Sequence, residues 1–347
     1  MDYCIAGSPG SRGWSSIDHM QLLLQRACGG RSAHLRAMPP RWQRALTLVR
    51  GKPSGAEAVI LVARTPSDFA AIATIPELRR KCHTRAAFVS DAFHYDWFPR
   101  EAAWFDRIFV TRQEDVEAVA RRTGRPVSYL PVGTDAMGLV REAFSTRVPR
   151  TVDLLIYGRQ IPEYEKNRVA ERARGLGLTV QVDIPMDQEP EANQRAVLGA
   201  LVQAKFGLGF CSSLGYYFGF SRPLAMLTPR WLDNLAAGTV MLGKAPQPAG
   251  SAALLGWEGG CVDIPLTLEE GLPVIQRLVR EYDERVAWRN HYESVVRNDW
   301  RLRFRDMFAE LGVPAPAPLV AELEQLARYR SSLEQMLDLP AAGRVSA

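Results

Sequence analysis

Residues 228–246, TPRWLDNLAAGTVMLGKAP, combine helical spacing with groups that could hold an anionic ligand. Pro229 fits a first helical turn, where its missing N–H is harmless, and Gly238 fits the C-terminal stop. The N-terminus of such a helix presents backbone N–H groups suited to phosphate. Arg230 would add a guanidinium fork for phosphate oxygens, and the carboxylate of Asp233 can accept hydrogen bonds from a vicinal diol such as ribose. The helix dipole also stabilises an acid near a helix N-terminus without any ligand, so both interpretations of Asp233 stay open.

The segment before this helix, GFCSSLGYYFGFSRPLAMLTPR (209–230), is rich in glycine, serine and aromatic residues. Such a loop can follow the shape of a ligand, and its aromatic rings can stack on a base or a sugar. Ser221 and Arg222 are its candidate polar contacts. An ordinary surface loop with core tyrosines would have the same composition, but the position before a phosphate-binding helix favours function.

Positioning these residues requires a parallel α/β sheet, and the chain has the pattern of one. Short apolar runs typical of buried strands alternate with helical segments. The first half contains such runs at 2–7, 58–65, 86–93, 106–112 and 126–135, and the second half contains them at 152–158, 178–184, 205–211, 239–243 and 260–264. Because ligands of parallel sheets bind beyond the carboxyl ends of the strands, we expect the site there.

The length and the pattern indicate two domains. The chain has 347 residues, whereas one domain usually has about 150. A polar stretch with a late proline ends the first half, and the strand pattern restarts near residue 150. We predict domains over 1–145 and 146–290, a closing helix over 291–313, and an amphipathic tail helix with a disordered end over 314–347.

The composition argues against several classes of protein. The net charge of +5 comes mainly from arginines spread along the chain, which suits anionic small molecules or a membrane surface better than nucleic acid. Five widely spaced cysteines without a CxxC pair argue against a disulfide framework and a zinc site. The N-terminus lacks a signal-peptide pattern and no apolar run reaches about 18 residues, so we expect a cytoplasmic protein.

Two motifs give the chain a resemblance to a known family. RWLDNLAAG (230–238) is similar to the pattern R-x-F-E-x-x-A-x-G, and YLPVGTD (129–135) is similar to the lPxGvD that ends the first domain of the same enzymes. Together with the strand DLLIYG (153–158), they resemble GT-B-fold glycosyltransferases, in particular the glycosyltransferase group 1 domain of the CgeB-like family. The resemblance implies an α/β protein with two Rossmann-like parallel-sheet domains facing each other across a cleft, and a C-terminal helix crossing back.

The resemblance also implies which residues hold a nucleotide sugar. Arg230 falls on the family arginine, and Asp233 falls on the glutamate that binds the ribose hydroxyls, as an acid one methylene shorter. Ala237, Gly238 and Thr239 fall on the small residues that let the backbone approach the ligand.

At the mouth of the opening strand of the second domain, the resemblance places Tyr157, Gly158 and Arg159 close to the expected diphosphate. Arg159 would there neutralise the departing phosphate. A surface ion pair between Arg159 and Glu163 is equally compatible with the sequence.

The first domain would then hold the acceptor and any catalytic base. An inverting transfer needs an acid or histidine that deprotonates the acceptor hydroxyl. Asp18, followed by His19, lies on the first turns of the helix after the first strand, at the edge where enzymes of this fold place such a group. Asp91 and His94 follow a later strand, in a position similar to the HD segment of many GT-B enzymes. The structural alternative for Asp18 and His19 is that they only neighbour a helix cap. The alternative for Asp91 and His94 is that they form part of the wall between the domains.

These features predict a metal-independent glycosyltransferase that moves a sugar from a nucleoside-diphosphate sugar to a glycan, lipid-linked or protein acceptor. We expect no cofactor, no nucleic-acid partner and no metal ion, since no DxD-like pair follows a strand and the remaining histidines lack ligand spacing. A GT-B-shaped epimerase or phosphorylase, a catalytically degenerate scaffold and a two-domain ligand-binding sensor are the alternatives. Donor, acceptor, stereochemistry and oligomeric state stay open, as does peripheral contact with the inner face of a membrane.

Overall fold

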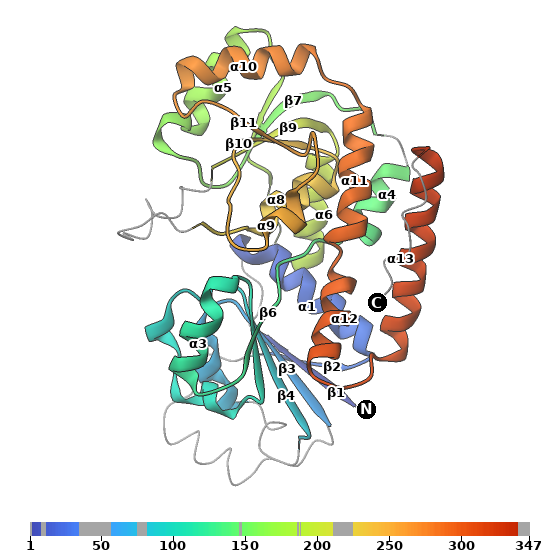
Figure 1. Cartoon of the computed structure of the whole chain (residues 1–347). Coiled ribbons are helices and arrows are strands. Elements are labelled where there is room, and N and C mark those ends of the chain that lie inside the picture. Colours follow the sequence, from blue (N-terminus) through green and yellow to red (C-terminus); the bar gives the residue numbers. More distant parts are fainter. Residues whose placement is uncertain are drawn as a thin grey trace. The chain divides into compact units, whose positions relative to one another are not determined.

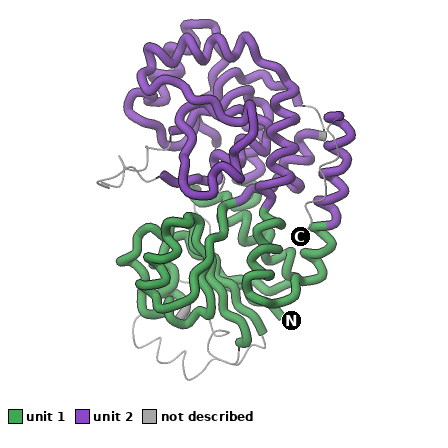
Figure 2. The backbone as a smooth tube through the Cα atoms, viewed as in Figure 1, with its two compact units in different colours: residues 1–132, 188–193, 300–323 green, residues 133–187, 194–299, 324–347 purple. Residues whose placement is uncertain are grey.

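A computed structural model describes residues 2–7, 12–34, 57–74, 82–145, 148–185, 187, 189–210 and 225–338. The chain divides into two compact units, shown in Figures 1 and 2. The first unit comprises residues 1–132, 188–193 and 300–323, and the second comprises 133–187, 194–299 and 324–347. The chain therefore leaves the first unit after Val132, contributes residues 188–193 to it, and returns to it with Trp300.

The first unit is built on a six-stranded parallel sheet with the order β2-β1-β3-β4-β5-β6. Its strands are β1 (Tyr3–Gly7), β2 (Arg31–His34), β3 (Ala58–Ala63), β4 (Thr84–Val89), β5 (Arg107–Val110) and β6 (Val127–Tyr129). The run AVILVA in β3 is buried at all six positions. Continuous apolar strands of this kind need helices on both faces of the sheet, which is why the sequence alternates strand and helix.

Among the described residues of the first unit, three α-helices and several 3-10 helices accompany this sheet. They are α1 (Ser15–Cys28), α3 (Val116–Thr123) and α12 (Trp300–Glu310), with η1 (Arg12–Trp14), η2 (Pro66–Thr74), η4 (Tyr95–Trp97), η5 (Arg100–Trp104) and η6 (Gln113–Asp115). Helix α12 comes from the C-terminal part of the chain, and its Phe308 ring packs edge-on against Tyr3 of β1. Trp300 packs in the same way against Phe88 of β4. The predicted return of a C-terminal helix is therefore confirmed.

The second unit is built on a five-stranded parallel sheet with the order β11-β10-β9-β7-β8. Its strands are β7 (Val152–Ile156), β8 (Val180–Val182), β9 (Ala204–Phe210), β10 (Val240–Lys244) and β11 (Cys261–Asp263). The described helical segments of this part of the chain are η7 (Ala136–Val140), α4 (Arg141–Ser145), η8 (Pro162–Tyr164), α5 (Lys166–Gly175), α8 (Pro229–Ala236), α9 (Ser251–Leu255), α10 (Leu268–Arg280) and α11 (Arg285–Arg297). Helices α6 (Pro190–Leu201) and α13 (Ala317–Met336) begin in the first unit and end in the second. Two parallel sheets with interleaved helices confirm the predicted pair of Rossmann-like domains.

Two glycines in β9 determine how closely α8 packs on the second sheet. Side chains alternate along a strand, so Gly207 and Gly209 share one face of β9. A Cβ atom at Gly207 would collide with the amide oxygen of Asn234 in α8. A Cβ atom at Gly209 would lie 3.2 Å from the indole of Trp231 in the same helix. The sequence GLG therefore lets α8 lie directly against the strand.

Candidate functional site

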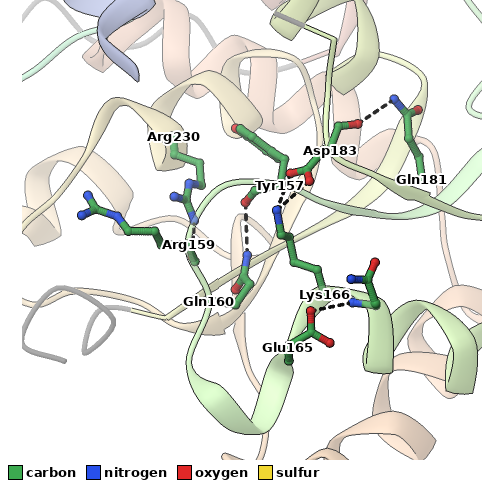
Figure 3. A network of polar contacts seen from close by, with 9 residues as sticks. Tyr157, Arg159, Gln160, Glu165, Lys166, Gln181, Asp183 and Arg230 are labelled. Atoms are coloured by element: carbon green, nitrogen blue, oxygen red, sulfur yellow. Dashed lines mark hydrogen bonds and ion pairs between the residues drawn. The ribbon is translucent and has the colours of Figure 1, made fainter. Parts of the chain in front are cut away.

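The candidate site lies at the carboxyl edge of the second sheet, where β7 ends and α8 begins. Tyr157 follows β7 directly, and Gly158 turns the chain with a φ of +67°, a conformation that favours glycine. The guanidinium of Arg230, in the first turn of α8, lies 5.5 Å from the centre of the Tyr157 ring. Its Nη1 donates a hydrogen bond of 2.9 Å to the carbonyl of Arg159 (Figure 3). The structure therefore brings together four of the predicted residues, from segments about 70 positions apart.

The absence of a side chain at Gly158 is part of this arrangement. A Cβ atom there would collide with the guanidinium of Arg230. Pro229 occupies the start of α8, as the sequence predicted, and no side chain caps the helix with a hydrogen bond. Two cationic side chains and a helix N-terminus at one sheet edge form an environment suited to phosphate.

Two amide side chains that the sequence analysis missed hold this edge in place. Asn234 Nδ2 donates to the hydroxyl of Tyr157 at 2.8 Å and to the carbonyl of Arg230 at 2.7 Å. Gln160 Nε2 donates to the carbonyls of Tyr157 at 3.2 Å and Leu208 at 3.1 Å, which ties the ends of β7 and β9 together. In the sequence, each amide directly follows a candidate residue, Asn234 after Asp233 and Gln160 after Arg159. Such a neighbour is too common in proteins to indicate a site.

Burial determines the protonation of this group. It raises the pKa of Tyr157, so that the phenol keeps its proton and stays neutral at physiological pH. Burial also lowers the pKa of Arg230, and the nearby charge of Arg159 acts in the same direction, but an arginine keeps its charge at any pH that a protein survives. The edge is therefore positively charged.

Asp233 lies further along α8 and is 3% exposed. Its Oδ1 accepts a hydrogen bond of 2.8 Å from the Thr134 hydroxyl, and its Oδ2 accepts one of 3.1 Å from the Gln194 amide. The carboxylate thus ties α8 to α6 and to the segment that opens the second unit. Binding of a ribose by Asp233 stays a prediction, and it would have to share a carboxylate that already has two internal donors.

Replacing Asp233 with alanine is expected to lower the free energy of unfolding by about 2 kcal/mol, because Thr134 and Gln194 would be left as buried donors without this acceptor. Chemical denaturation measures the change. Asp233→Asn keeps the shape and one acceptor oxygen, and a smaller loss is expected from it. Equal stability of the alanine variant and the wild type would contradict this structural role.

Gly238 and Thr239 lie at the opposite, amino edge of the sheet. Gly238 ends α8 with a φ of +81°, which confirms the predicted helix stop, and a Cβ atom there would lie 2.7 Å from Phe144. The hydroxyl of Thr239 donates to the carbonyl of Leu201 at 2.7 Å, just before β10 begins. Because a crossover helix runs antiparallel to its strands, the two ends of α8 cannot serve one small site. The structure does not bring these two residues together with Arg230.

A cavity of about 580 Å³ also lies at the amino edge, and not at the predicted site. Its lining includes Phe144, Arg150, Trp288 and Met336. Arg150 donates hydrogen bonds of 2.6 Å to the carbonyls of Ala204 and Ala237, and burial lowers its pKa. The guanidinium of Arg150 thus compensates backbone carbonyls at the amino edge, which is a structural use.

Arg222, and Ser221 beside it, lie outside the described residues. The expected contribution of the loop before α8 therefore stays a prediction.

In the first unit, the predicted base Asp18 is paired with an arginine. Asp18 lies in the first turn of α1 and is 6% exposed. Its Oδ1 accepts hydrogen bonds from Arg64 Nη2 at 2.5 Å and from Arg64 Nε at 3.1 Å, just beyond the end of β3. The carboxylate thus already has a cationic partner within its own unit. His19, the next residue, is buried in α1.

The second predicted pair follows β4 at the carboxyl edge of the first sheet. The backbone N–H of Asp91 donates to the carbonyl of Arg64 at 2.9 Å, which places Asp91 beside the residue that holds Asp18. The ring of His94 lies between those of Phe93 and Trp97, with centroid distances of 4.3 Å and 3.8 Å. Burial lowers the pKa of His94, so the imidazole is neutral near pH 7, the form that a general base requires.

Two further expectations concern metal ions and membranes. Within the described ranges, no group of three or more His, Cys, Asp or Glu side chains could hold a metal ion. In the same part of the chain, none of the helices combines the length and the apolar character needed to cross a lipid bilayer.

Known proteins resemble this chain in structure and not in sequence. No family model matches the chain, and no curated protein matches it. The resemblance to the CgeB-like family thus rests on its short motifs alone.

Three solved structures illustrate the similarity. WaaB, a lipopolysaccharide outer core galactosyltransferase, is 12% identical over 89% of this chain and 100% of its own, with a TM-score of 0.47. A UDP-GlcNAc 2-epimerase from Methanocaldococcus jannaschii is 11% identical over 82% and 94%, with a TM-score of 0.44. The GtfA/B complex is 10% identical, with a TM-score of 0.42, and its match covers 79% of this chain but only 62% of that chain. At these identities and TM-scores the similarities carry no argument about activity.

Proposed function

We propose that this protein is a GT-B glycosyltransferase that transfers a sugar from a nucleoside-diphosphate sugar to an acceptor, without a metal ion or other cofactor. The observation that carries the proposal lies at the carboxyl edge of the second sheet. There the guanidinium of Arg230, in the first turn of α8, lies against Tyr157 and Gly158, which follow β7. Arg230 and Arg159 would hold the diphosphate and stabilise the charge that develops on it as the sugar leaves.

His94 is the best candidate for a base in the first unit. Its imidazole is neutral near pH 7, whereas the carboxylate of Asp18 is already neutralised by Arg64. An inverting transfer would use His94 to take the proton of the acceptor hydroxyl. We further propose a cytoplasmic location, with a glycan, a lipid-linked saccharide or a protein as the acceptor.

A catalytically degenerate scaffold is the second candidate. The specific observation that favours it is the use of both Asp233 oxygens by Thr134 and Gln194, since the family acid at this position would bind the donor ribose. Such a scaffold could still bind a nucleotide through Arg230 without turning it over.

Nucleotide binding is tested by the thermal stability of the full chain with UDP, GDP, ADP, dTDP and CMP. A nucleotide at 100 times its dissociation constant stabilises the folded state by about 2.7 kcal/mol. We expect one nucleoside diphosphate to produce such a shift. Arg230→Ala is expected to weaken its binding about 30-fold, because hydrogen bonds to charged groups contribute about 2 kcal/mol.

Arg172→Ala is the matched control, since Arg172 is an exposed arginine in the last turn of α5, which runs toward the amino edge of the same sheet. It should leave the shift unchanged. A wild-type protein that unfolds cooperatively and shows no shift with any of the five nucleotides would overturn the proposal. A shift without release of nucleoside diphosphate from the matching nucleotide sugars would support the scaffold.

A further inference from the structure

The first unit presents one flat face of a tryptophan ring to solvent. Trp97, at the end of η4, is 51% exposed. Its ring stacks on the imidazole of His94 with a centroid distance of 3.8 Å and an interplanar angle of 5°. Because the imidazole covers one face of the indole, the exposed half of Trp97 includes the opposite face. Phe93 supports the imidazole from a buried position, so the stack is anchored in the core.

The turn that carries this stack is held in place by the protein itself. Arg122 of α3 donates hydrogen bonds of 3.2–3.4 Å to the carbonyls of Tyr95, Asp96 and Phe98. The N–H of Trp97 donates to the carbonyl of His94 at 3.0 Å. These bonds fix the backbone on both sides of the indole, so that little conformational entropy is left to lose when a ligand stacks on it.

A second set of contacts fixes the turn from beneath. The Tyr95 hydroxyl donates to Oδ1 of Asp115 at 2.8 Å. Asp115 is fully buried, and its Oδ1 lies 3.3 Å from Nη1 of Arg112. The exposed indole is therefore attached to the carboxyl edge of the sheet through β5 as well as β4. A rigidly mounted aromatic ring offers contact area to a ligand at a low cost in conformational entropy.

The charges around Trp97 indicate the chemistry of its ligand. Asp96 and Arg100 are both exposed and flank the indole in sequence with opposite signs, and the exposed guanidinium of Arg122 lies against the same turn, so groups of both signs surround the indole. The face of a pyranose ring is apolar where its C–H groups point, while its edge carries hydroxyls. Such a ring can stack on the indole and exchange hydrogen bonds with a carboxylate beside it.

We propose that the exposed face of Trp97 binds a pyranose ring of a saccharide. As a binding site, the Trp97 face is independent of the nucleotide edge of the second unit. As the acceptor site, it rests on the proposed function and makes a saccharide the acceptor class.

The proposal is tested with the full chain and four neutral trisaccharides, namely chitotriose, maltotriose, mannotriose and galactotriose, by saturation-transfer NMR and by titration. At least one of them should receive saturation from the wild-type protein. Trp97→Ala is expected to weaken its binding about tenfold or more, and Trp97→Phe to restore part of it, because an aromatic ring is needed and a smaller one covers less of the sugar.

Trp104→Ala is the matched control, since Trp104 lies in the neighbouring η5 and is 41% exposed. It should bind as the wild type does, and thermal unfolding of each variant confirms that it is folded. Saturation transfer that is equal in Trp97→Ala and wild type would overturn the proposal, as would no transfer to any trisaccharide. Sedimentation with phosphatidylglycerol vesicles that depends on Trp97, without any saccharide response, would identify a lipid surface instead. Because the nucleotide test uses Arg230, either result can fail without the other.

Discussion

Gly243→Ala is expected to lower the free energy of unfolding by about 3–4 kcal/mol, the largest effect that the structure predicts for a single methyl group. Gly243 lies in β10 with a φ of +140°, where an L side chain is strained. A Cβ atom there would collide with the carbonyl oxygen of Gly209, its register partner in β9. A backbone carbonyl in a ladder cannot move aside as the end of a side chain can, so the two central strands would have to separate.

Urea denaturation followed by far-UV circular dichroism measures this effect, and Gly199→Ala is the matched control. Gly199 lies inside α6, where a Cβ atom meets no neighbour within 4 Å. Alanine is a better helix former than glycine, so this control should raise stability by up to about 1 kcal/mol. Opposite signs for the two substitutions are the expected result, and a Gly243→Ala protein within 1 kcal/mol of wild type would be incompatible with the strand geometry.

The second large effect is a loss of stability on acidification that depends on His291. This residue of α11 is fully buried, and its Nδ1 lies 2.7 Å from the carbonyl of Ala236. A carbonyl can only accept, so Nδ1 carries the proton, and Nε2 accepts from the Tyr329 hydroxyl at 2.7 Å. Both bonds are made by the neutral ring, which also stacks on Phe144. Burial lowers the pKa of His291 to about 4, and the nearby charge of Arg150 acts in the same direction.

The sign of the effect follows from linkage. Above pH 6.5, the ordinary pKa of histidine, both states carry a neutral ring and His291 adds no pH dependence. Between pH 6.5 and about pH 4 the unfolded chain binds a proton that the folded protein does not bind, so stability falls as the pH falls. The loss reaches about 3 kcal/mol near pH 4, at about 1.4 kcal/mol for each pH unit, and then levels off.

Denaturation curves at a series of pH values check this prediction. His291→Phe keeps the ring stack but cannot titrate, so its stability should fall less steeply over the same window, although the variant is less stable at pH 7 because two hydrogen bonds are lost. His83→Gln is the control, since His83 is exposed to solvent, and its pH profile should follow that of the wild type. Parallel profiles for His291→Phe and wild type would show that the buried imidazole does not control acid stability.

The sequence by itself determined the architecture. Apolar runs such as those of β3 and β7 can be buried fully only in a sheet that is covered on both faces. Their alternation with helices indicates crossover connections and therefore parallel strands. The stop of α8 at Gly238 was equally local, because it depends on a backbone conformation that glycine favours. The sequence also brought Tyr157 and Arg230 to one edge, since the carboxyl end of a strand and the N-terminus of a following helix always meet there.

Only the tertiary structure decided which polar groups are engaged within the protein. Asp233 has the same spacing whether its carboxylate binds a ribose or accepts from Thr134, a residue 99 positions away. Asp18 is a candidate base by its sequence position, but in the structure it is paired with Arg64. The turn that carries Trp97 is fixed by Arg122 and by the hydrogen bond between Tyr95 and Asp115. Secondary structure follows from local conformation and periodicity, but the partner of a hydrogen-bonding group is supplied by whichever distant segment the fold brings beside it.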